Sequence, residues 1–200
     1  MKIAFDGKRA VKNGTGLGNY SRYVLESLCR HADSDDKFIV YSPKGRMNAW
    51  MQRIIDTFSS RLSLVINSSV FASVWRTFGV TQDAENAGAE IFHGLSNELP
   101  LNIGKSKMKS VVTIHDLIFR RMPECYKFID RKIYDYKFRK AAENADVVIA
   151  KGQGNFESLE GFFTARPVYF LFRAKCPVIQ EYLGVSFGSL QIQGRNLTVK

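Results

Sequence analysis

The stretch AENADVVIAKGQGNFESL (residues 142–159) decides the fold, because it changes character in the middle. Its first half has the pattern of a helix end followed by a buried strand, DVVIA. Its second half is a polar loop, broken by glycines, that can open another helix. A helix that leads directly into a short apolar run is typical of α/β proteins. The contrast between the halves makes the stretch either one site or a junction between two segments.

Short apolar runs alternate with amphipathic segments upstream of this stretch. The expected strands are KIAF, KFIVYS, LSLVI, EIFHG, SVVTIHD and DVVIA, and the expected helices lie at 19–31, 47–58, around 70–78 and at 128–145. Strands that alternate with helices indicate a parallel sheet covered on both faces. We therefore predict that residues 1–150 form an α/β domain with a doubly wound, Rossmann-like parallel sheet.

The alternation of strands and helices ends after residue 150. PVYFLF, CPVI, SLQIQ and NLTVK are short β-prone runs separated by tight turns. About 50 residues cannot easily bury a core of their own. The sequence therefore predicts that residues 151–200 form a short β-rich C-terminal extension, with little helix, that adds strands to the sheet.

The charge balance favours anionic partners. The chain has 29 Lys+Arg against 19 Asp+Glu, a net charge of +10. This excess fits phosphorylated substrates, acidic lipid headgroups or nucleic acid, although it can also serve solubility alone. The three cysteines are far apart and form no C-x-x-C pair, which fits a reducing cytosol. No run approaches the roughly 18 apolar residues of a membrane span, and the N-terminus does not resemble a signal peptide. We expect a cytoplasmic protein, with possible peripheral contact at the inner face of the membrane.

The segment NGTGLGNY (residues 13–20) lies between the first strand and the first helix. In a doubly wound sheet, ligands bind at the carboxyl ends of the strands. Gly14, Gly16 and Gly18 would let a phosphate or sugar approach the backbone, so we predict that these glycines and Asn19 bind substrate. The dinucleotide fingerprint G-x-G-x-x-G fails because Asn19 takes the place of its last glycine, which excludes NAD. The alternative is a turn that only connects the strand to the helix.

His115 and Asp116 directly follow the apolar run SVVTI. A histidine at a strand end can donate to a sugar hydroxyl or act as an acid or base near neutral pH. We therefore predict that His115 is catalytic, that Asp116 binds substrate, and that both lie near the glycine segment. The alternative is that both residues cap the next helix. His93 is a weaker candidate for the same reason.

Four blocks resemble the N-terminal half of family-4 glycosyltransferases of the GT-B fold: MKIAFDGKRAVKNGTGLGNYSRYVLESL, IFHGLSNELPL, VVTIHDLIFRRMPECY and KFRKAAENADVVIA. This resemblance covers residues 1–150 and implies an acceptor-binding domain whose glycine segment and His115 face a cleft. A nucleotide sugar would be the donor. The resemblance also implies that most donor contacts belong to a second domain not found in this chain, so we expect little transfer activity.

The tail resembles a different family. ADVVIAKGQGNFESL and PVYFLFRAKCPVIQEYLGVSFGSL are similar to the C-terminus of the metal-dependent damage-control phosphatases, over about residues 145–200. The resemblance implies a divalent metal held by Asp and Asn side chains upstream. DAENAGAE (residues 83–90) contains the letters of such a motif but not its adjacent Asp-Asn pair. These two resemblances indicate a chimera, in which segments from two families join within a helix–strand element that both families contain.

The start of the phosphatase-like tail suggests a phosphate-binding loop. Lys151 supplies charge at a strand end, and Gly152, Gln153 and Gly154 expose backbone N–H groups. Asn155 is expected to cap the following helix. If this strand lies parallel to SVVTI, Lys151 faces the same crevice as His115. The alternative is a lysine-bearing turn with no ligand.

Three functions remain in competition. The leading hypothesis is a glycosyltransferase-related protein that binds a sugar or lipid-linked acceptor and is incomplete as a catalyst. The second is a phosphatase-related protein acting on a sugar phosphate, and the third is a non-catalytic binding protein or fusion fragment. Residues 127–140 contain six Lys/Arg against two Asp, which could contact an anionic membrane, whereas nucleic acid is an unlikely partner.

Overall fold

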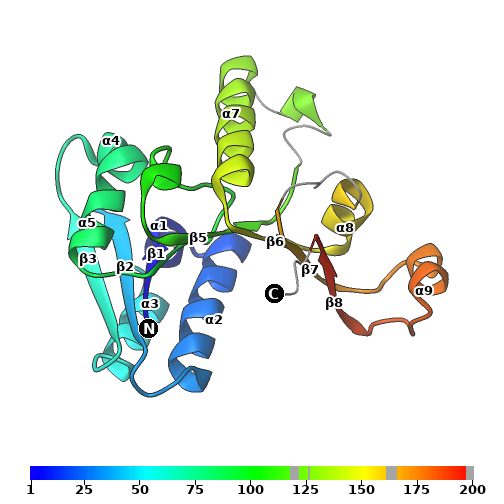
Figure 1. Ribbon diagram of the computed structural model, residues 1–200, viewed down its shortest axis with the longest axis horizontal. Coiled ribbons are helices and arrows are strands. Elements are labelled where there is room, and N and C mark those ends of the chain that lie inside the picture. The colour runs from blue at the N-terminus through cyan, green and yellow to red at the C-terminus, as the bar shows by residue number, and fades with distance from the viewer. Residues whose placement is uncertain (118–121, 126, 161–165, 197–200) are drawn as a thin grey trace.

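The computed structural model describes residues 1–117, 122–125, 127–160 and 166–196. Within these ranges the chain builds one eight-stranded sheet of order β3-β2-β1-β4-β5-β6-β7-β8 (Figure 1). The strands are β1 (Lys2–Asp6), β2 (Lys37–Pro43), β3 (Leu62–Asn67), β4 (Ile91–Gly94), β5 (Lys109–Ile114), β6 (Val147–Lys151), β7 (Val168–Arg173) and β8 (Leu190–Arg195). Neighbouring strands are parallel except β7 and β8, which are antiparallel. The predicted α/β class and largely parallel, Rossmann-like sheet are confirmed, whereas a GT-B half stays a prediction.

Helices occupy most connections between the strands. They are α1 (Lys8–Lys12), α2 (Gly16–His31), α3 (Ala49–Thr57), α4 (Ala72–Val74), the π-helical η1 (Trp75–Gly79), α5 (Val80–Asn86), the 3₁₀ turns η2 (Ile103–Lys105) and η3 (Pro123–Cys125), α7 (Phe128–Asn144), α8 (Gln153–Leu159) and α9 (Pro177–Leu183). The helix expected around 70–78 is thus a series of three short helical segments that continues to Asn86.

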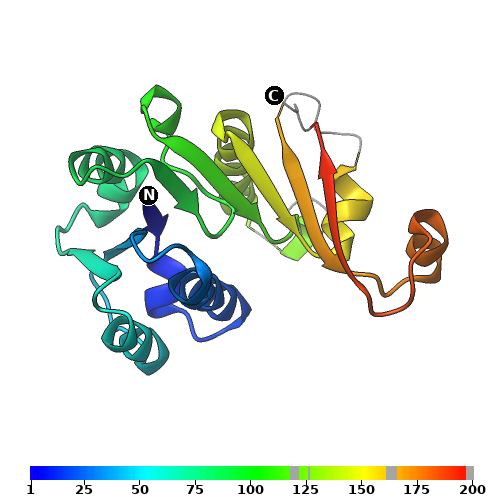
Figure 2. The ribbon, with the colours of Figure 1, turned by 60° about the horizontal axis from the view of Figure 1, so that its bottom comes forward.

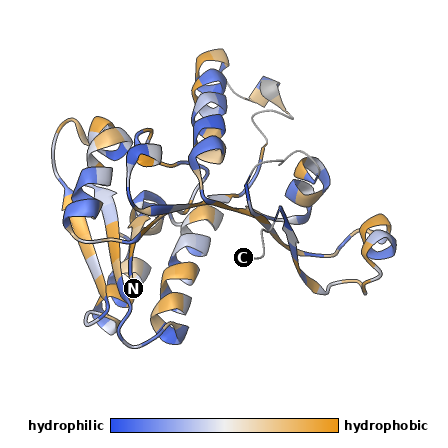
Figure 3. Ribbon diagram, in the orientation of Figure 1, coloured by the Kyte–Doolittle hydropathy of each residue, from blue (hydrophilic) through white to orange (hydrophobic). Residues whose placement is uncertain are grey.

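Two hydrophobic cores lie on opposite faces of the sheet. Helices α1, α2 and α3 cover one face, and α5, α7 and α8 cover the other (Figure 1). Phe5, Leu25 and Met51 belong to the first core, and Phe92 and Phe156 belong to the second. Apolar residues mark α2 and several strands, whereas α7 is largely hydrophilic (Figure 3). Because successive strand residues point to opposite faces, one strand such as β1 contributes to both cores.

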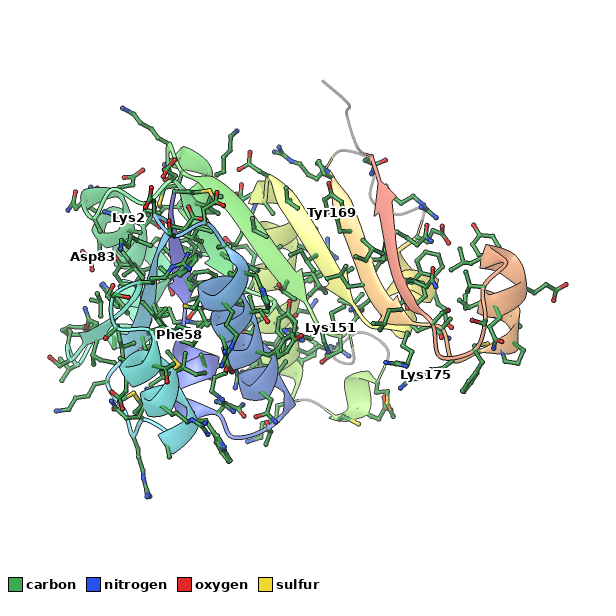
Figure 4. All side chains as sticks on the ribbon, turned by 90° about the horizontal axis from the view of Figure 1, so that it is seen from below. Lys2, Phe58, Asp83, Lys151, Tyr169 and Lys175 are labelled. Carbon is green, nitrogen blue, oxygen red and sulfur yellow. The ribbon has the colours of Figure 1, made fainter. Side chains whose placement is uncertain are left out.

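The C-terminal half of the sheet is covered on one face only. Strands β5 to β8 lie side by side in Figure 2. No described helix crosses the face of β6, β7 and β8 that is turned toward the viewer in Figure 4. Ile149 is paired with Tyr169, and Leu171 with Ile192, so these side chains share that face. We call Val147, Ile149, Tyr169, Leu171, Leu190 and Ile192 the open face. Leu190 and Ile192 are 76% and 72% exposed. The sheet is therefore doubly wound over β1–β3 but singly covered over β6–β8.

The C-terminal extension joins the sheet as predicted, but it is not simply β-rich. PVYFLF and SLQIQ form β7 and β8, whereas CPVI, expected as a strand, begins helix α9. Pro177 occupies the first turn of α9, where its fixed φ suits a helix and its missing N–H costs nothing. Gly184 ends α9 with φ of +66°, the left-handed conformation that favours glycine. Most of the expected run NLTVK, residues 197–200, lies outside the described residues.

Strand β6 runs across the predicted domain boundary at residue 150. It pairs with β5 on one side and with β7 on the other. Residues on both sides of the boundary therefore share one sheet and one hydrophobic core. The division into domains 1–150 and 151–200 stays a prediction.

Candidate functional site

Parallel pairing brings the carboxyl ends of β1, β4, β5 and β6 to one edge of the sheet, which we call the carboxyl edge. The strand order reverses between β1 and β4, and ligands in open α/β sheets bind at such a switch point. A depression with an empty volume of about 640 Å³ lies there. It is lined by Arg9, Leu17, Ser96, Asn97, Glu98, Asp116, Tyr134, Lys137 and Phe138. The carboxyl edge is therefore the candidate site. Asp116 lines the depression, and its substrate-binding role stays a prediction.

Two hydrogen bonds fix His115 beside this depression. Its Nε2 lies 2.8 Å from the Leu95 carbonyl oxygen, and its backbone N–H donates to Asn97 Oδ1 at 2.7 Å. A carbonyl oxygen only accepts, so Nε2 carries the proton of the neutral ring and Nδ1 is left as the acceptor. Burial, with a smaller effect of the Lys151 charge, lowers the pKa of His115, although the Leu95 carbonyl and Asp116 oppose this. His115 is thus a neutral imidazole near pH 7.

Tyr20 of α2 brings His115 and Lys151 together. The Tyr20 and His115 rings meet edge to face, with centroids 4.7 Å apart and planes at 85°. The Lys151 Nζ lies 5.3 Å from the centroid of the Tyr20 ring. Lys151 and His115 thus contact the same ring. That they share one ligand crevice with the glycine segment stays a prediction. Their roles in binding or catalysis stay a prediction.

A buried polar chain anchors Tyr20. Its hydroxyl lies 3.4 Å from Thr113 Oγ1, which in turn is 2.9 Å from His93 Nε2. Burial, aided by nearby His115, lowers the pKa of His93 from 6.5 to about 4. His93 therefore stays neutral inside the sheet and supports Tyr20 through Thr113. Tyr20 was not among the site residues predicted from the sequence.

Lys151 is exposed at the end of β6 (Figure 4). No carboxylate in the described part of the chain forms an ion pair with it. Its contact with the Tyr20 ring is worth about 0.5–1 kcal/mol at an exposed site. That attraction orients the ammonium group but leaves its charge uncompensated. Lys151 can therefore bind an anionic group.

The glycine segment is more helical than expected. A short helix, α1, precedes the segment, and α2 begins at Gly16, before the expected helix start at residue 19. A Cβ on Gly18 would lie 1.9 Å from the Asn13 carbonyl oxygen, so close packing requires this glycine. Asn19 Oδ1 accepts from Arg22 Nη2 at 2.6 Å. Only Leu17 of this segment lines the depression. A substrate role for Gly14, Gly16, Gly18 and Asn19 stays a prediction.

The predicted phosphate loop is mostly used by the fold itself. The Gly152 N–H donates to the Leu171 carbonyl oxygen at 2.8 Å. Gln153 Oε1 accepts the Lys175 N–H, and Gln153 Nε2 donates to Glu157. Asn155 is not the expected cap, because α8 begins at Gln153 and Gly152 holds the cap position.

Asn155 instead ties two strand ends together. Its Nδ2 donates to the carbonyl oxygens of Ile114 and Lys151. Of the expected phosphate contacts, the Lys151 ammonium and the backbone N–H groups of Gln153 and Gly154 remain, since the first amides of a helix lack intrahelical partners.

Arg76 pairs with two acidic residues, of which Glu98 also lines the depression. Its guanidinium donates to Asp6 Oδ2 through Nε at 2.9 Å and to Glu98 Oε2 through Nη1 at 2.7 Å. Lys137 also approaches Glu98, at 3.3 Å. Burial opposes the charge on Arg76, but the charges of Asp6 and Glu98 outweigh it and raise the Arg76 pKa. These two carboxylates are therefore neutralised within the protein.

The described residues do not fit a divalent metal. In the ranges given above, no three His, Cys, Asp or Glu side chains gather into a possible metal site. The acids of residues 83–90 are used in separate contacts: Asp83 accepts from Trp75 Nε1, Glu85 from Ser106, and Glu90 from the Lys2 N–H. The function proposed below therefore involves no metal ion. None of the described helices is long and apolar enough to cross a bilayer.

Comparison with known proteins identifies one family. The sequence model of the damage-control phosphatase ARMT1-like domain matches residues 81–190, from α5 to the first residue of β8. This match begins at residue 81, whereas the resemblance seen in the sequence begins at about residue 145. The upstream part includes residues 83–90, which contain the letters of a phosphatase motif without its adjacent Asp-Asn pair. His115, Asp116 and Lys151 lie inside the match, whereas Tyr20 lies outside it.

Three archaeal relatives are similar over short stretches. A damage-control phosphatase of Pyrococcus horikoshii is 46% identical over 59 residues, which is 30% of this chain and 20% of that protein. An uncharacterized protein of Methanocaldococcus jannaschii is 35% identical over 82 residues, covering 40% and 24% of the two chains. A damage-control phosphatase of Archaeoglobus fulgidus is 40% identical over 52 residues, covering 26% and 18%. The chain thus spans about a fifth of the length of these relatives.

Proposed function

The chain belongs to the damage-control phosphatase ARMT1-like domain family, and from that membership we propose that it binds the phosphate group of a phosphorylated small molecule, such as a sugar phosphate, at the carboxyl edge. This agrees with the second of the three functions that the sequence left in competition. The glycosyltransferase hypothesis, with its nucleotide-sugar donor and sugar or lipid-linked acceptor, stays a prediction for residues 1–150. Contact with an anionic membrane also stays a prediction.

The position of Lys151 carries the proposal. It is an exposed cation without a carboxylate partner among the described residues, and it contacts the same Tyr20 ring as His115. A phosphate placed there meets the ammonium group and the first N–H groups of α8. His115 Nδ1 can accept a hydrogen bond from a phosphate or sugar hydroxyl. Water reaches the site, so the attraction is partly screened and falls as salt is added.

The proposal covers binding and not hydrolysis. Members of this family generally depend on a divalent metal, and the described residues do not fit one. Without such an ion, neither Lys151 nor a neutral His115 generates a strong nucleophile from water. The chain also spans only about a fifth of its curated relatives, so the activity of those whole proteins is not carried over to it.

Calorimetric titration with a hexose phosphate tests the proposal. Lys151→Ala is expected to weaken binding about tenfold, the loss of one hydrogen bond to a charged group. Lys107→Ala is the matched control, because Lys107 is also exposed but precedes β5 at the opposite edge of the sheet. The unphosphorylated hexose should bind far more weakly than its phosphate. Equal affinity of the Lys151→Ala and unmodified chains would refute the proposal.

A further inference from the structure

A second candidate site lies on the helices that cover β1–β3, outside the segment that matches the phosphatase family. A groove with an empty volume of about 880 Å³ runs between α2 and α3, and we call it the α2–α3 groove. Its walls include Arg22, Tyr23, Glu26, Arg30, Trp50 and Arg53. These residues follow helical spacing on each helix, so their side chains converge on the space between the helices.

The groove carries positive charge that the described protein does not neutralise. Arg22 is only 4% exposed, yet its guanidinium donates to three neutral oxygens, those of Ala10, Asn13 and the Asn19 side chain. No described carboxylate forms an ion pair with Arg22 or with the exposed Arg53. Burial lowers the pKa of Arg22, as expected for a cation that lacks a counter-charge. Glu26 is already paired with Arg30 at 2.7 Å. The groove walls therefore carry more positive than negative charge.

Flat aromatic surface lies beside these cations. The Arg22 guanidinium lies 5.5 Å from the centroid of the Trp50 ring. Trp50 nevertheless remains 62% exposed, and Tyr23 is 70% exposed. Two exposed aromatic rings beside a buried guanidinium form a surface on which another planar ring can stack. A ligand that matches both features carries an anionic group and a planar ring in one molecule.

We propose that the α2–α3 groove binds a nucleoside monophosphate. The base stacks on Trp50, and the phosphate meets Arg53 and the guanidinium of Arg22. Inorganic phosphate can bind only to the arginines, and a nucleoside can stack only on the aromatic rings. The site is separate from the carboxyl edge, so each can fail without the other.

Amide chemical shifts followed during titration with adenosine monophosphate test this site. The shifts are expected to map to residues 19–30 and 49–58. The affinity should be about tenfold above that for inorganic phosphate, because the base adds a stacking contact. It should also be about tenfold above that for adenosine, which lacks the phosphate. Trp50→Ala and Arg53→Ala should each weaken binding by a similar factor. Both side chains are exposed, so these changes spare the fold, and unchanged spectra elsewhere would verify this.

Arg139→Ala provides the control, since Arg139 lies on α7, on the opposite face of the sheet (Figure 1). It removes the same charge and should leave binding unchanged. Three results would overturn the assignment: no response in the two helices, equal binding of phosphate alone, or unchanged affinity in Trp50→Ala. A response confined to residues 151–154 would also overturn it, because the nucleotide would then occupy the carboxyl edge.

Discussion

Tyr20 connects the part of the chain outside the family match to the candidate site inside it. One ring contacts both His115 and Lys151, and its hydroxyl reaches Thr113. Burial of the His115 ring, to which the Tyr20 ring contributes, lowers the pKa of His115. Tyr20 is therefore a positioning residue, which acts on a ligand through the two side chains that it holds.

Replacing Tyr20 should release His115 from this environment. In Tyr20→Leu the imidazole gains water and Lys151 loses its support, so the pKa of His115 is expected to rise toward its ordinary value. Tyr20→Phe keeps the ring and loses only the hydroxyl, and should leave that pKa almost unchanged. Titration of the His115 ring protons by NMR measures both. A His115 pKa that is the same in Tyr20→Leu would show that Tyr20 does not position it.

His93 should make the protein acid-sensitive. The folded protein holds the pKa of His93 at about 4, whereas the unfolded chain has the ordinary 6.5, so the unfolded chain takes up the proton first. The free energy of unfolding should therefore fall as pH drops from about 6.5 toward 4. His93→Gln, which can still bond to Thr113, should flatten this dependence.

Urea unfolding at pH 7 and at pH 5, compared between the two proteins, measures this effect of His93. Carboxylates titrate in both proteins, so only the difference between them reports on His93. Identical losses of stability on acidification would contradict the assignment.

At the scale of elements, the sequence predicted strands β1 to β6 because apolar runs bounded by polar residues are a local signal. It did not predict α1 or α9, which are short and lack a long amphipathic repeat. The CPVI run has β-prone residues, but Pro177 and Gly184 set the two ends of a helix and outweigh that preference. The site was predictable in part, because motifs that follow parallel strands must share an edge. Tyr20 was not, since its contact with Thr113 spans 93 residues.

Gly152 provides a direct test of the turn between β6 and α8. Its φ of +103° is a conformation that side chains rarely adopt, so Gly152→Ala should lower the free energy of unfolding by about 1–3 kcal/mol. Gly154 lies in the helix with open space around it, and Gly154→Ala should be neutral or stabilising by about 0.5–1 kcal/mol. Chemical denaturation compares the two. Equal effects would mean that the turn does not require glycine at 152.

At the scale of the whole molecule, residues 81–190, which match the family, and the strands before residue 81 belong to one sheet. The sequence predicted that the tail would add strands, because so few residues cannot form a core alone. It could not predict the open face, since β6 and β7 have the apolar pattern of strands covered on both sides. Coverage depends on where helices return in space, which no local pattern records.

The open face should bind an apolar dye. Anilinonaphthalene sulfonate is expected to fluoresce with the folded protein, and Ile192→Ser should reduce this signal at little cost in stability, because Ile192 is 72% exposed. Val70→Ser is the control, since Val70 is 93% exposed but lies apart from the open face. If both variants reduced the fluorescence equally, the dye would not report on the open face.

The central claim is that phosphate binds at the carboxyl edge beside Lys151 and His115. Its most direct test is the pKa of His115 with and without inorganic phosphate. A bound anion favours the imidazolium form, so phosphate should raise this pKa above the value measured in chloride at the same ionic strength. Lys151→Ala should abolish the rise, and Lys107→Ala should preserve it. A His115 pKa that phosphate does not change would contradict the account.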